Sequence, residues 1–220
     1  MANEQREFWS RVAQKYDAVV DAQIGPRTRS LLRERVARED RLGRVVEFGC
    51  GTGFFTGTLA ARADHVLATD LSPGMLALAK ERTTAPNVTF QVEDCQRCSL
   101  PARAFDTAFM SLVIHFTEPA TTVAEMHRVL RPRGTLVVLN LDMNALRGLD
   151  RVRALVRIVY RGATGYRLKP PKGFGSNMLG GEQMGELLAR CGFDVVARET
   201  ITDDSRSSHI PVNYLHAVKL

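Results

Sequence analysis

Two hydrophobic periods alternate along residues 44–141. Short runs of aliphatic and β-branched residues predict buried strands. Between these runs, apolar residues recur every three or four positions, which predicts amphipathic helices. The expected strands lie at residues 44–47, 65–69, 87–92, 105–110 and 135–141, and the expected helices cover residues 54–62, 73–82 and 118–131. Strands that alternate with helices are typical of right-handed βαβ units, so this interval predicts a parallel sheet.

The flanking segments extend the α/β pattern. Helices are expected over residues 3–18 and 26–37 before the core, and over residues 145–161 and 181–190 after it. Two closing strands are expected over residues 193–200 and 211–220. The 220 residues contain no internal repeat and no second domain, so we expect one α/β domain over residues 1–220 with helices on both faces of the sheet.

A glycine-rich turn follows the first expected strand. Gly49, Gly51 and Gly53 alternate after Glu47, and an expected helix comes next. Glycine permits φ > 0 and lets a ligand lie directly on the backbone, while the free N–H groups of the helix start face that ligand. The spacing is G-x-G-x-G, not the G-x-G-x-x-G of dinucleotide sites. Asp70 ends the next strand, where a carboxylate can accept hydrogen bonds from ribose hydroxyls.

With these features the chain resembles the class I S-adenosylmethionine (SAM)-dependent methyltransferases. Within them it is most similar to the group of ubiquinone/menaquinone-biosynthesis and small-molecule methyltransferases. The matching motifs are Glu47–Gly53, Ala68–Met75, Glu93–Cys95, Phe105–Asp106 and Arg128–Thr135. The resemblance implies a Rossmann-like, seven-stranded, mostly parallel sheet with an antiparallel last strand. It also implies methyl transfer from SAM to a small-molecule acceptor, with S-adenosylhomocysteine as the second product.

Two other functions remain as alternatives. An NAD(P)-dependent oxidoreductase could use the same sheet, but the glycine spacing, Glu47 and Asp94 argue against it. A non-catalytic SAM-binding partner subunit is disfavoured because the glycine turn and Asp70 are intact. The acceptor atom (O, N, C or S) is left open, since function does not follow from fold alone.

The resemblance also implies a set of cofactor contacts. The glycine backbone would lie against the methionine part, Asp70 would hold the ribose, and Asp94 would accept from the adenine amino group. The full expected set is Tyr16, Glu47, Gly49, Cys50, Gly51, Gly53, Asp70, Leu71, Met75, Asp94, Cys95 and Ser111. Each has a structural alternative: a carboxylate can cap backbone N–H groups, Met75 can be ordinary core, and Tyr16 can simply pack its helix on the core.

The substrate half of the chain carries weaker signals. His115 follows the fourth expected strand and could serve as a general base, although a buried packing histidine is the alternative and some nucleophiles need no base. Tyr160, Tyr166 and Phe174 could line the substrate pocket. The resemblance implies an N-terminal helical lid over residues 1–37, a SAM-binding core over 44–141, a substrate-capping insertion over 142–176, and a closing helix and strands over 177–220.

Charge is concentrated in the expected insertion. The chain carries +6, but residues 145–175 hold eight basic residues against Asp150, so this segment carries +7 and the remainder −1. Arginines recur at four-residue steps at 153, 157 and 161, which places them along one side of a helix. This side could be a solvated face, or it could meet an anionic, lipid-like or quinone-like substrate or a membrane surface. Nucleic acid is disfavoured because no aromatic residues interleave with the arginines.

The cysteines and the lengths of the apolar runs bear on metal binding and on the cellular location of the protein. Four cysteines in 220 residues do not make a disulfide framework, and the lone Cys95-x-x-Cys98 pair lacks partner ligands, so no metal site is expected. No apolar run reaches the ~18 residues that span a bilayer, and the first residues lack a signal-peptide core. We expect a cytoplasmic protein, and a homo-oligomer is compatible with the sequence.

Overall fold

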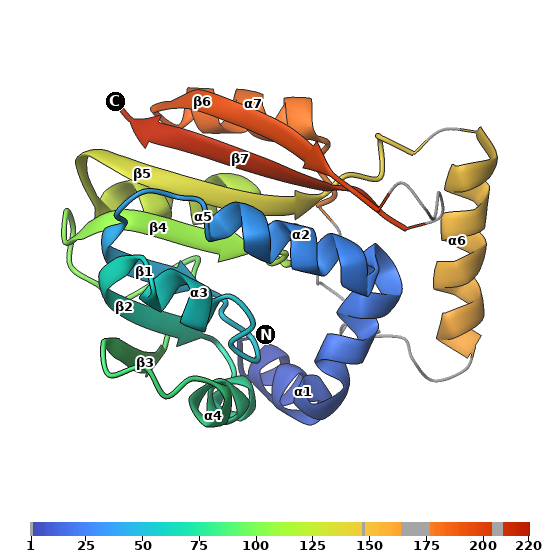
Figure 1. The fold of residues 1–220 in the computed structure, drawn as a ribbon, viewed down its shortest axis with the longest axis horizontal. Coiled ribbons are helices and arrows are strands. Elements are labelled where there is room, and N and C mark those ends of the chain that lie inside the picture. Colours follow the sequence, from blue (N-terminus) through green and yellow to red (C-terminus); the bar gives the residue numbers. More distant parts are fainter. Residues whose placement is uncertain (1, 147, 164–176, 204–208) are drawn as a thin grey trace.

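The computed structural model describes residues 2–146, 148–163, 177–203 and 209–220. Figure 1 shows one sheet with helices packed against both faces. The strands, in the order in which they lie side by side, are β3 (Val88–Val92), β2 (Ala63–Asp70), β1 (Gly43–Phe48), β4 (Phe105–Ser111), β5 (Leu130–Leu141), β7 (Val212–Lys219) and β6 (Phe193–Ile201). The order confirms the seven-stranded Rossmann-like sheet.

The direction of the strands also matches the expectation. Strands β1 to β5 pair in parallel, whereas β7 runs antiparallel to both of its neighbours, β5 and β6. From β1 the chain builds outward through β2 to β3 on one side, and through β4 to β5 on the other. Ligands of such sheets bind at the carboxyl ends of the strands where this order reverses, which here is the border of β1 and β4.

Two buried clusters, one on each face of the sheet, hold the helices. Helices α2 (Pro26–Val36), α3 (Thr56–Ala60) and α4 (Pro73–Arg82) contribute Leu32, Leu59 and Leu76 to the cluster that contains Val45 of β1. Helices α5 (Pro119–Val129) and α7 (Gly181–Arg190) contribute to the opposite cluster, which contains Val46. Val45 and Val46 are both fully buried, as expected for a central parallel strand.

Local chemistry explains why several helices end where the sequence predicts. Helix α4 begins with Pro73, and the Ser72 hydroxyl accepts a hydrogen bond from the Met75 N–H at 3.1 Å. Helix α7 ends before Gly192, whose φ of +83° suits glycine. Both helices cover the predicted residues.

Two of the differences in element length have a clear local reason. Helix α3 is confined to Thr56–Ala60 rather than residues 54–62, because Gly53 at φ +78° keeps the chain in a turn before it. Helix α5 ends at Val129, and β5 begins at Leu130 instead of Thr135. Pro132 disfavours helical geometry at the residue before it, and Leu130 pairs with Phe105 of β4 instead.

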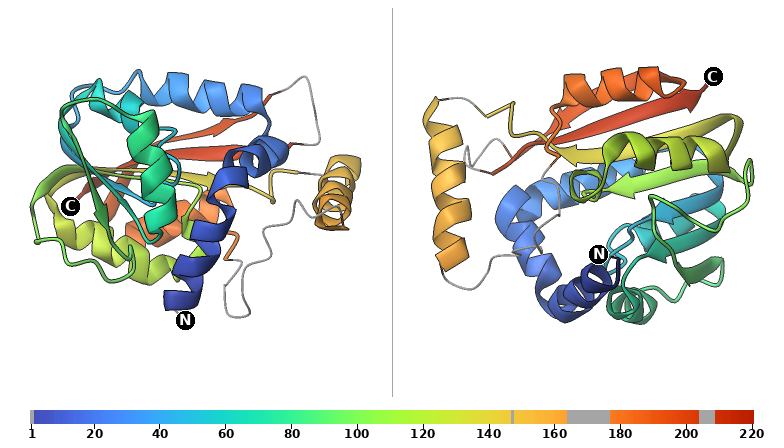
Figure 2. Two further views of the ribbon diagram at one scale, coloured as in Figure 1. Left: turned by 90° about the horizontal axis from the view of Figure 1, so that it is seen from below. Right: turned by 180° about the vertical axis from the view of Figure 1, so that it is seen from behind.

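The two ends of the sheet carry the remaining helices. Helix α1 (Ala2–Ile24), which extends beyond the expected residue 18, lies across α4, and a short 3-10 helix, η1 (Ile114–Phe116), follows β4. Helix α6 (Gly148–Ala163) stands apart from the sheet, on the side toward which β4 and β5 point (Figures 1 and 2). In the described part of the chain, no helix is long and apolar enough to cross a membrane.

Candidate active site

Two adjoining cavities lie at the carboxyl ends of the central strands and share Tyr16, Gly49 and Gly51. Among the residues expected to bind the cofactor, the first cavity is lined by Tyr16, Gly49, Gly51, Asp70, Leu71, Met75, Asp94 and Cys95. The second is lined by Tyr16, Glu47, Gly49, Cys50, Gly51 and Ser111. The fold therefore brings together residues from five separate segments of the sequence.

Asp70 fixes the glycine turn through its carboxylate. One oxygen accepts a hydrogen bond from the Gly51 N–H at 2.9 Å, and the other accepts from the Ser72 N–H at 2.8 Å. Burial raises the pKa of Asp70 to about 6, although these backbone hydrogen bonds oppose the rise. The carboxylate thus shapes the turn and lines the first cavity at the same time, so the structural and ligand-binding interpretations of Asp70 coexist.

The glycines of the turn have different reasons for lacking a side chain. Gly49, at φ +65°, leaves no room for a Cβ, which would lie 2.5 Å from Cγ2 of Val113. Gly51, at φ +55°, faces the ring of Tyr16, with 3.4 Å between a built Cβ and Cε1. In the part of the chain that the structure describes, Gly53 does not line either cavity. A Cβ there would lie 3.0 Å from Cα of Ala79, so its place is in the packing of the turn against α4.

Glu47 lies beneath the second cavity and is 2% exposed. Its carboxylate accepts a hydrogen bond from the Thr56 hydroxyl at 2.7 Å. Burial raises the pKa of Glu47 to about 7, and the charge of Asp70 adds to the rise. A cationic group in this cavity would favour the ionised form of Glu47.

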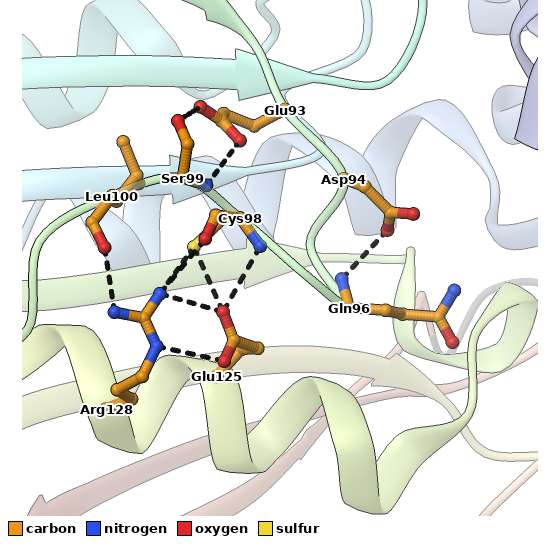
Figure 3. Close-up of polar contacts among 8 residues, drawn as sticks. All are labelled: Glu93, Asp94, Gln96, Cys98, Ser99, Leu100, Glu125 and Arg128. Carbon is orange, nitrogen blue, oxygen red and sulfur yellow. Dashed lines mark hydrogen bonds and ion pairs between the residues drawn. The ribbon is translucent and has the colours of Figure 1, made fainter.

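Figure 3 shows how the loop after β3 separates two neighbouring carboxylates. Glu93 is bonded to Ser99, whose N–H donates to it at 2.9 Å and whose hydroxyl donates as well. Asp94 points away from Glu93 and accepts from the Gln96 N–H at 2.9 Å. Because Ser99 engages both oxygens of Glu93, Asp94 is the carboxylate with more acceptor capacity left for a ligand.

The second cysteine of the Cys95-x-x-Cys98 pair packs against α5 rather than against the cavity. Its Sγ lies 3.3 Å from Oε2 of Glu125, and Arg128 donates to Glu125 at 2.8 Å and to the Leu100 carbonyl at 2.8 Å (Figure 3). Burial raises the pKa of the Cys98 thiol. The described residues contain no cluster of ligands that could hold a metal ion.

Helix α1 is tied over the glycine turn by one carboxylate. Asp17 accepts hydrogen bonds from Arg29 at 2.5 Å, from the Thr52 hydroxyl at 2.8 Å and from Arg82 at 2.5 Å. Burial alone would raise the pKa of Asp17, but these donors outweigh it and lower the pKa. The three donors lie on α2, the glycine turn and α4, so Asp17 joins α1 to all three.

Aromatic rings from α1 cover the first cavity. Tyr16 makes an edge contact with Trp9, with 6.0 Å between ring centroids, and Trp9 makes one with Phe116 at 4.9 Å. Burial, followed by the charge of Asp70, raises the pKa of Tyr16 well above its usual value. The Tyr16 hydroxyl therefore stays protonated at physiological pH.

His115 lies in η1 and is 8% exposed. Its ring is 4.0 Å from the Phe116 ring, and its Nδ1 has no hydrogen-bond partner among the described residues. Burial lowers its pKa to about 4, so the imidazole is neutral. Its neighbours Val113, Phe116 and Thr117 line the first cavity, but His115 itself lines neither cavity in the described part of the chain. This placement favours the packing interpretation.

The structure adds residues that sequence reasoning missed and leaves others undescribed. Arg29 lines the second cavity, is 7% exposed and stacks on Phe54 at 3.8 Å. The residues around Arg29 in the sequence do not indicate that it lines a cavity, because its position depends on how α2 packs. Of the expected substrate residues, Tyr166 and Phe174 lie outside the described residues, as does the side chain of Tyr160.

Comparison with known proteins agrees with this geometry. The family described as "Methyltransferase domain" matches residues 46–138, which include the glycine turn, Asp70 and Asp94. Residues 46–138 therefore form a methyltransferase domain, in agreement with the resemblance to the class I SAM-dependent methyltransferases. SAM is the cofactor of this class, and the oxidoreductase and partner-subunit alternatives are not favoured.

Two relatives and one solved structure illustrate the similarity. A malonyl-[acyl-carrier protein] O-methyltransferase of Serratia marcescens is 32% identical over 144 residues, covering 64% of this chain and 54% of the relative. A malonyl-[acyl-carrier protein] O-methyltransferase of Paenibacillus is 26% identical over 226 aligned positions, which cover 98% of this chain and 79% of the relative. The crystal structure of a SAM-dependent methyltransferase from Mesorhizobium loti shares the fold, with a TM-score of 0.64 and 24% sequence identity. The superposition covers 84% of this chain and 95% of that protein. The match spans about half the length of the Serratia relative.

Proposed function

We propose that this methyltransferase transfers the methyl group of SAM to a carboxylate oxygen, forming a methyl ester. The observation that carries this proposal is the similarity to two proteins named as malonyl-[acyl-carrier protein] O-methyltransferases, and the described residues at the methionine end agree with an acceptor that needs no base. Tyr16 stays protonated, Glu47 is bonded to Thr56 beneath the turn, and His115 lies outside both cavities. A carboxylate acceptor is already ionised at neutral pH, so it needs no base.

The two cavities fit the two parts of the cofactor. In the first, Asp70 would accept from the ribose hydroxyls and Asp94 from the adenine amino group, with Leu71 and Met75 beside the ring. In the second, Glu47 would face the positively charged amino group of the methionine part. Burial raises the pKa of both Asp70 and Glu47, which disfavours their ionised forms in these cavities. The hydroxyl donors of the ribose and the cationic amino group of the methionine part would favour these ionised forms.

Arg29 would bind the carboxylate of the methionine part. A guanidinium has five N–H donors, and Arg29 uses one toward Asp17 and one toward Asp21 at 3.1 Å. The remaining donors leave capacity for a ligand in the second cavity, which Arg29 lines. Its stacking on Phe54 fixes the plane of the group.

When bound, SAM supplies a methyl carbon activated by the sulfonium charge. The protein's part is then to position the acceptor in line and to exclude water. Tyr16 and Trp9 on α1 would cover the reaction centre, held there by the Asp17 bonds. We infer that residues 1–37 act as a lid, and that residues 142–176 select the acceptor, as the resemblance implies.

The names of the relatives support a carboxylate acceptor. O-methylation of a malonyl group gives a methyl ester, and both the Serratia and the Paenibacillus relatives bear that activity in their names. We infer an acceptor of this chemistry, either a free acid or an acid carried on a protein. The described cysteines are free, which supports the expected cytoplasmic setting.

An acceptor panel tests the proposal. Purified protein and SAM are incubated with a malonyl-loaded carrier protein, free mono- and dicarboxylic acids, a phenol, an amine and a thiol, and S-adenosylhomocysteine is measured. We expect turnover with at least one carboxylate and none with the other classes. The Asp70→Asn variant serves as the matched control, because it keeps the size of the side chain. Turnover confined to the phenol, amine or thiol would overturn the proposal.

A further inference from the structure

Helix α6 leaves three of its described apolar side chains exposed. Leu149, Val152 and Val156 are 72%, 55% and 60% exposed. They lie three and four positions apart, so they form one row along a single face of the helix. Ala154, between them in sequence, is buried and belongs to the cluster that contains Leu146. The helix therefore contacts the protein with one face and presents an apolar row on another.

Basic side chains accompany this row. Arg151 and Arg153 are both exposed: Arg153 lies one turn after Leu149 at one edge of the row, whereas Arg151 lies about 100° round the helix from Val152 on the other side. The nearby acid, Asp150, pairs with Arg153 at 3.4 Å. In sequence, residues 145–175 carry a net charge of +7 while the rest of the chain carries −1. Helix α6 thus presents an apolar row with the Arg153–Asp150 pair at one edge and Arg151 further round the helix, within a segment whose sequence is basic.

The position of α6 allows it to meet a large flat partner. In both views of Figure 2 the helix stands at one end of the molecule, clear of the sheet. In Figure 1 it lies on the side toward which β4 and β5 point, the same side as the cofactor cavities. A surface that touched α6 would therefore lie near the entrance for the acceptor.

We propose that α6 docks this protein onto an anionic lipid surface. A helix with an exposed apolar row and exposed arginines can lie in the interface of a bilayer, with its aliphatic side chains among the acyl chains and its cations at lipid phosphates. Leu149, Val152 and Val156 supply the first contact and Arg151 and Arg153 the second. A single narrow row on a projecting helix fits a bilayer better than a protein partner, which would need a broader complementary surface. The docking brings acceptors with acyl chains to the site, and it stands whether or not the acceptor atom is a carboxylate.

Vesicle co-sedimentation tests the docking. The 220-residue protein is mixed with vesicles of phosphatidylcholine alone, or of an equal mixture of phosphatidylcholine and phosphatidylglycerol. We expect binding to the mixed vesicles and weak binding to phosphatidylcholine. The triple variant Leu149→Ser, Val152→Ser, Val156→Ser should bind the mixed vesicles at least about tenfold more weakly. The double variant Arg151→Gln, Arg153→Gln should lose about fivefold per arginine at low salt.

Matched controls use exposed residues of the same types elsewhere. Val196→Ser tests an exposed valine on β6, and the double variant Arg62→Gln, Arg198→Gln removes two exposed arginines that are not part of α6. These variants should bind mixed vesicles within about twofold of wild type, because they leave the helix intact. Unchanged S-adenosylhomocysteine affinity in every variant shows that the folded domain is preserved, and it separates this test from that of the proposed function.

Three outcomes would overturn the docking. The first is equal vesicle binding by wild type and the triple α6 variant. The second is no vesicle binding by wild type together with binding of an acidic carrier protein that the α6 variants lose, which would assign the helix to a protein partner. The third is no vesicle binding together with a wild-type dimer that the triple variant converts to a monomer, which would assign the row to a second copy of this chain.

Discussion

At the carboxyl edge of the sheet, the turn at the ends of β1 and β2 differs from the segment beyond β5 in the contacts that hold it. At the ends of β1 and β2, the turn is fixed by hydrogen bonds from Gly51, Thr52 and Ser72 to two carboxylates, Asp70 and Asp17. Beyond β5, helix α6 exposes its apolar row instead of burying it. The part proposed to bind the cofactor is held by these hydrogen bonds, whereas α6, in the segment proposed to select the acceptor, leaves a row of apolar side chains exposed.

One carboxylate carries much of that attachment. Asp142, just after β5, accepts from the N–H groups of Asn144 at 2.9 Å and Ala145 at 3.0 Å. Its other oxygen accepts from the Gly181 N–H at 3.1 Å and from Nδ2 of Asn213 at 2.8 Å. Both ends of the segment between β5 and α7 therefore meet at one buried side chain, and we expect changes in this segment to leave the proposed cofactor site undisturbed.

Replacement of Asp142 by alanine tests this separation with the largest expected effect. It leaves buried donors unpaired, and we expect a loss of about 4 kcal/mol in the free energy of unfolding. At a temperature where the variant is folded, its affinity for S-adenosylhomocysteine should match that of wild type, while kcat/KM for the acceptor falls. Denaturant unfolding and calorimetric titration measure the two quantities. An equal loss of cofactor affinity would show that this segment and the proposed cofactor site are coupled.

Replacement of Gly49 by alanine tests the proposed cofactor site. Its φ of +65° and the 2.5 Å approach to Val113 predict a loss of about 3 kcal/mol in S-adenosylhomocysteine binding, roughly a hundredfold. Gly51→Ala should lose less, since its built Cβ meets only the Tyr16 ring at 3.4 Å. Adding Val113→Ala to Gly49→Ala should restore part of the affinity. Equal losses at the two glycines would contradict the clash as the cause.

The pH dependence of stability isolates Glu47. Its pKa is about 7 in the folded protein and about 4.5 when unfolded, so the folded state holds the proton more tightly. Stability therefore falls as pH rises from about 4.5 to about 7, by about 2–3 kcal/mol from this group. Glu47→Gln keeps an acceptor for Thr56 and should remove that part of the slope. Unfolding curves of the cofactor-free proteins at several pH values measure the difference, and parallel slopes would refute it.

Replacement of His115 by phenylalanine should have the smallest effect. The ring packs against Phe116, its Nδ1 has no partner among the described residues, and a carboxylate acceptor needs no base. We expect kcat within about twofold of wild type, measured on the acceptor found in the panel. A loss of a hundredfold or more with unchanged acceptor KM would restore the general-base hypothesis.

The sequence predicted those parts of the fold that depend on local chemistry. The limits of α4 follow from Ser72 and Pro73, and the end of α7 follows from Gly192. The early start of β5 was missed because it depends on the pairing of Leu130 with Phe105, a contact between distant segments. The short α3 shows the same limit, since its hydrophobic pattern does not reveal how far the glycine turn extends.

The residues of the candidate site also fall into two groups, those that sequence motifs indicate and those that only tertiary packing brings to the cavities. Asp70 and Asp94, which the resemblance implied as cofactor contacts, both line the first cavity: Asp70 is the last residue of β2, and Asp94 lies two residues after β3. Arg29 could not be placed from the sequence, since it reaches the second cavity only through the packing of α2. Gly53 was placed with the cofactor on spacing alone, whereas its close neighbour is Ala79 of α4. Contacts made by tertiary packing leave no periodic trace in the sequence.

The most direct test of carboxylate methylation is the alkali lability of the product. Wild-type protein is incubated with SAM labelled in its methyl group and the acceptor found in the panel, and the labelled product is treated with mild alkali. A methyl ester hydrolyses and releases its label as volatile methanol, which is the result we predict. Label that stays on the product after alkali would show transfer to nitrogen, carbon, sulfur or an ether oxygen, and would contradict methylation of a carboxylate.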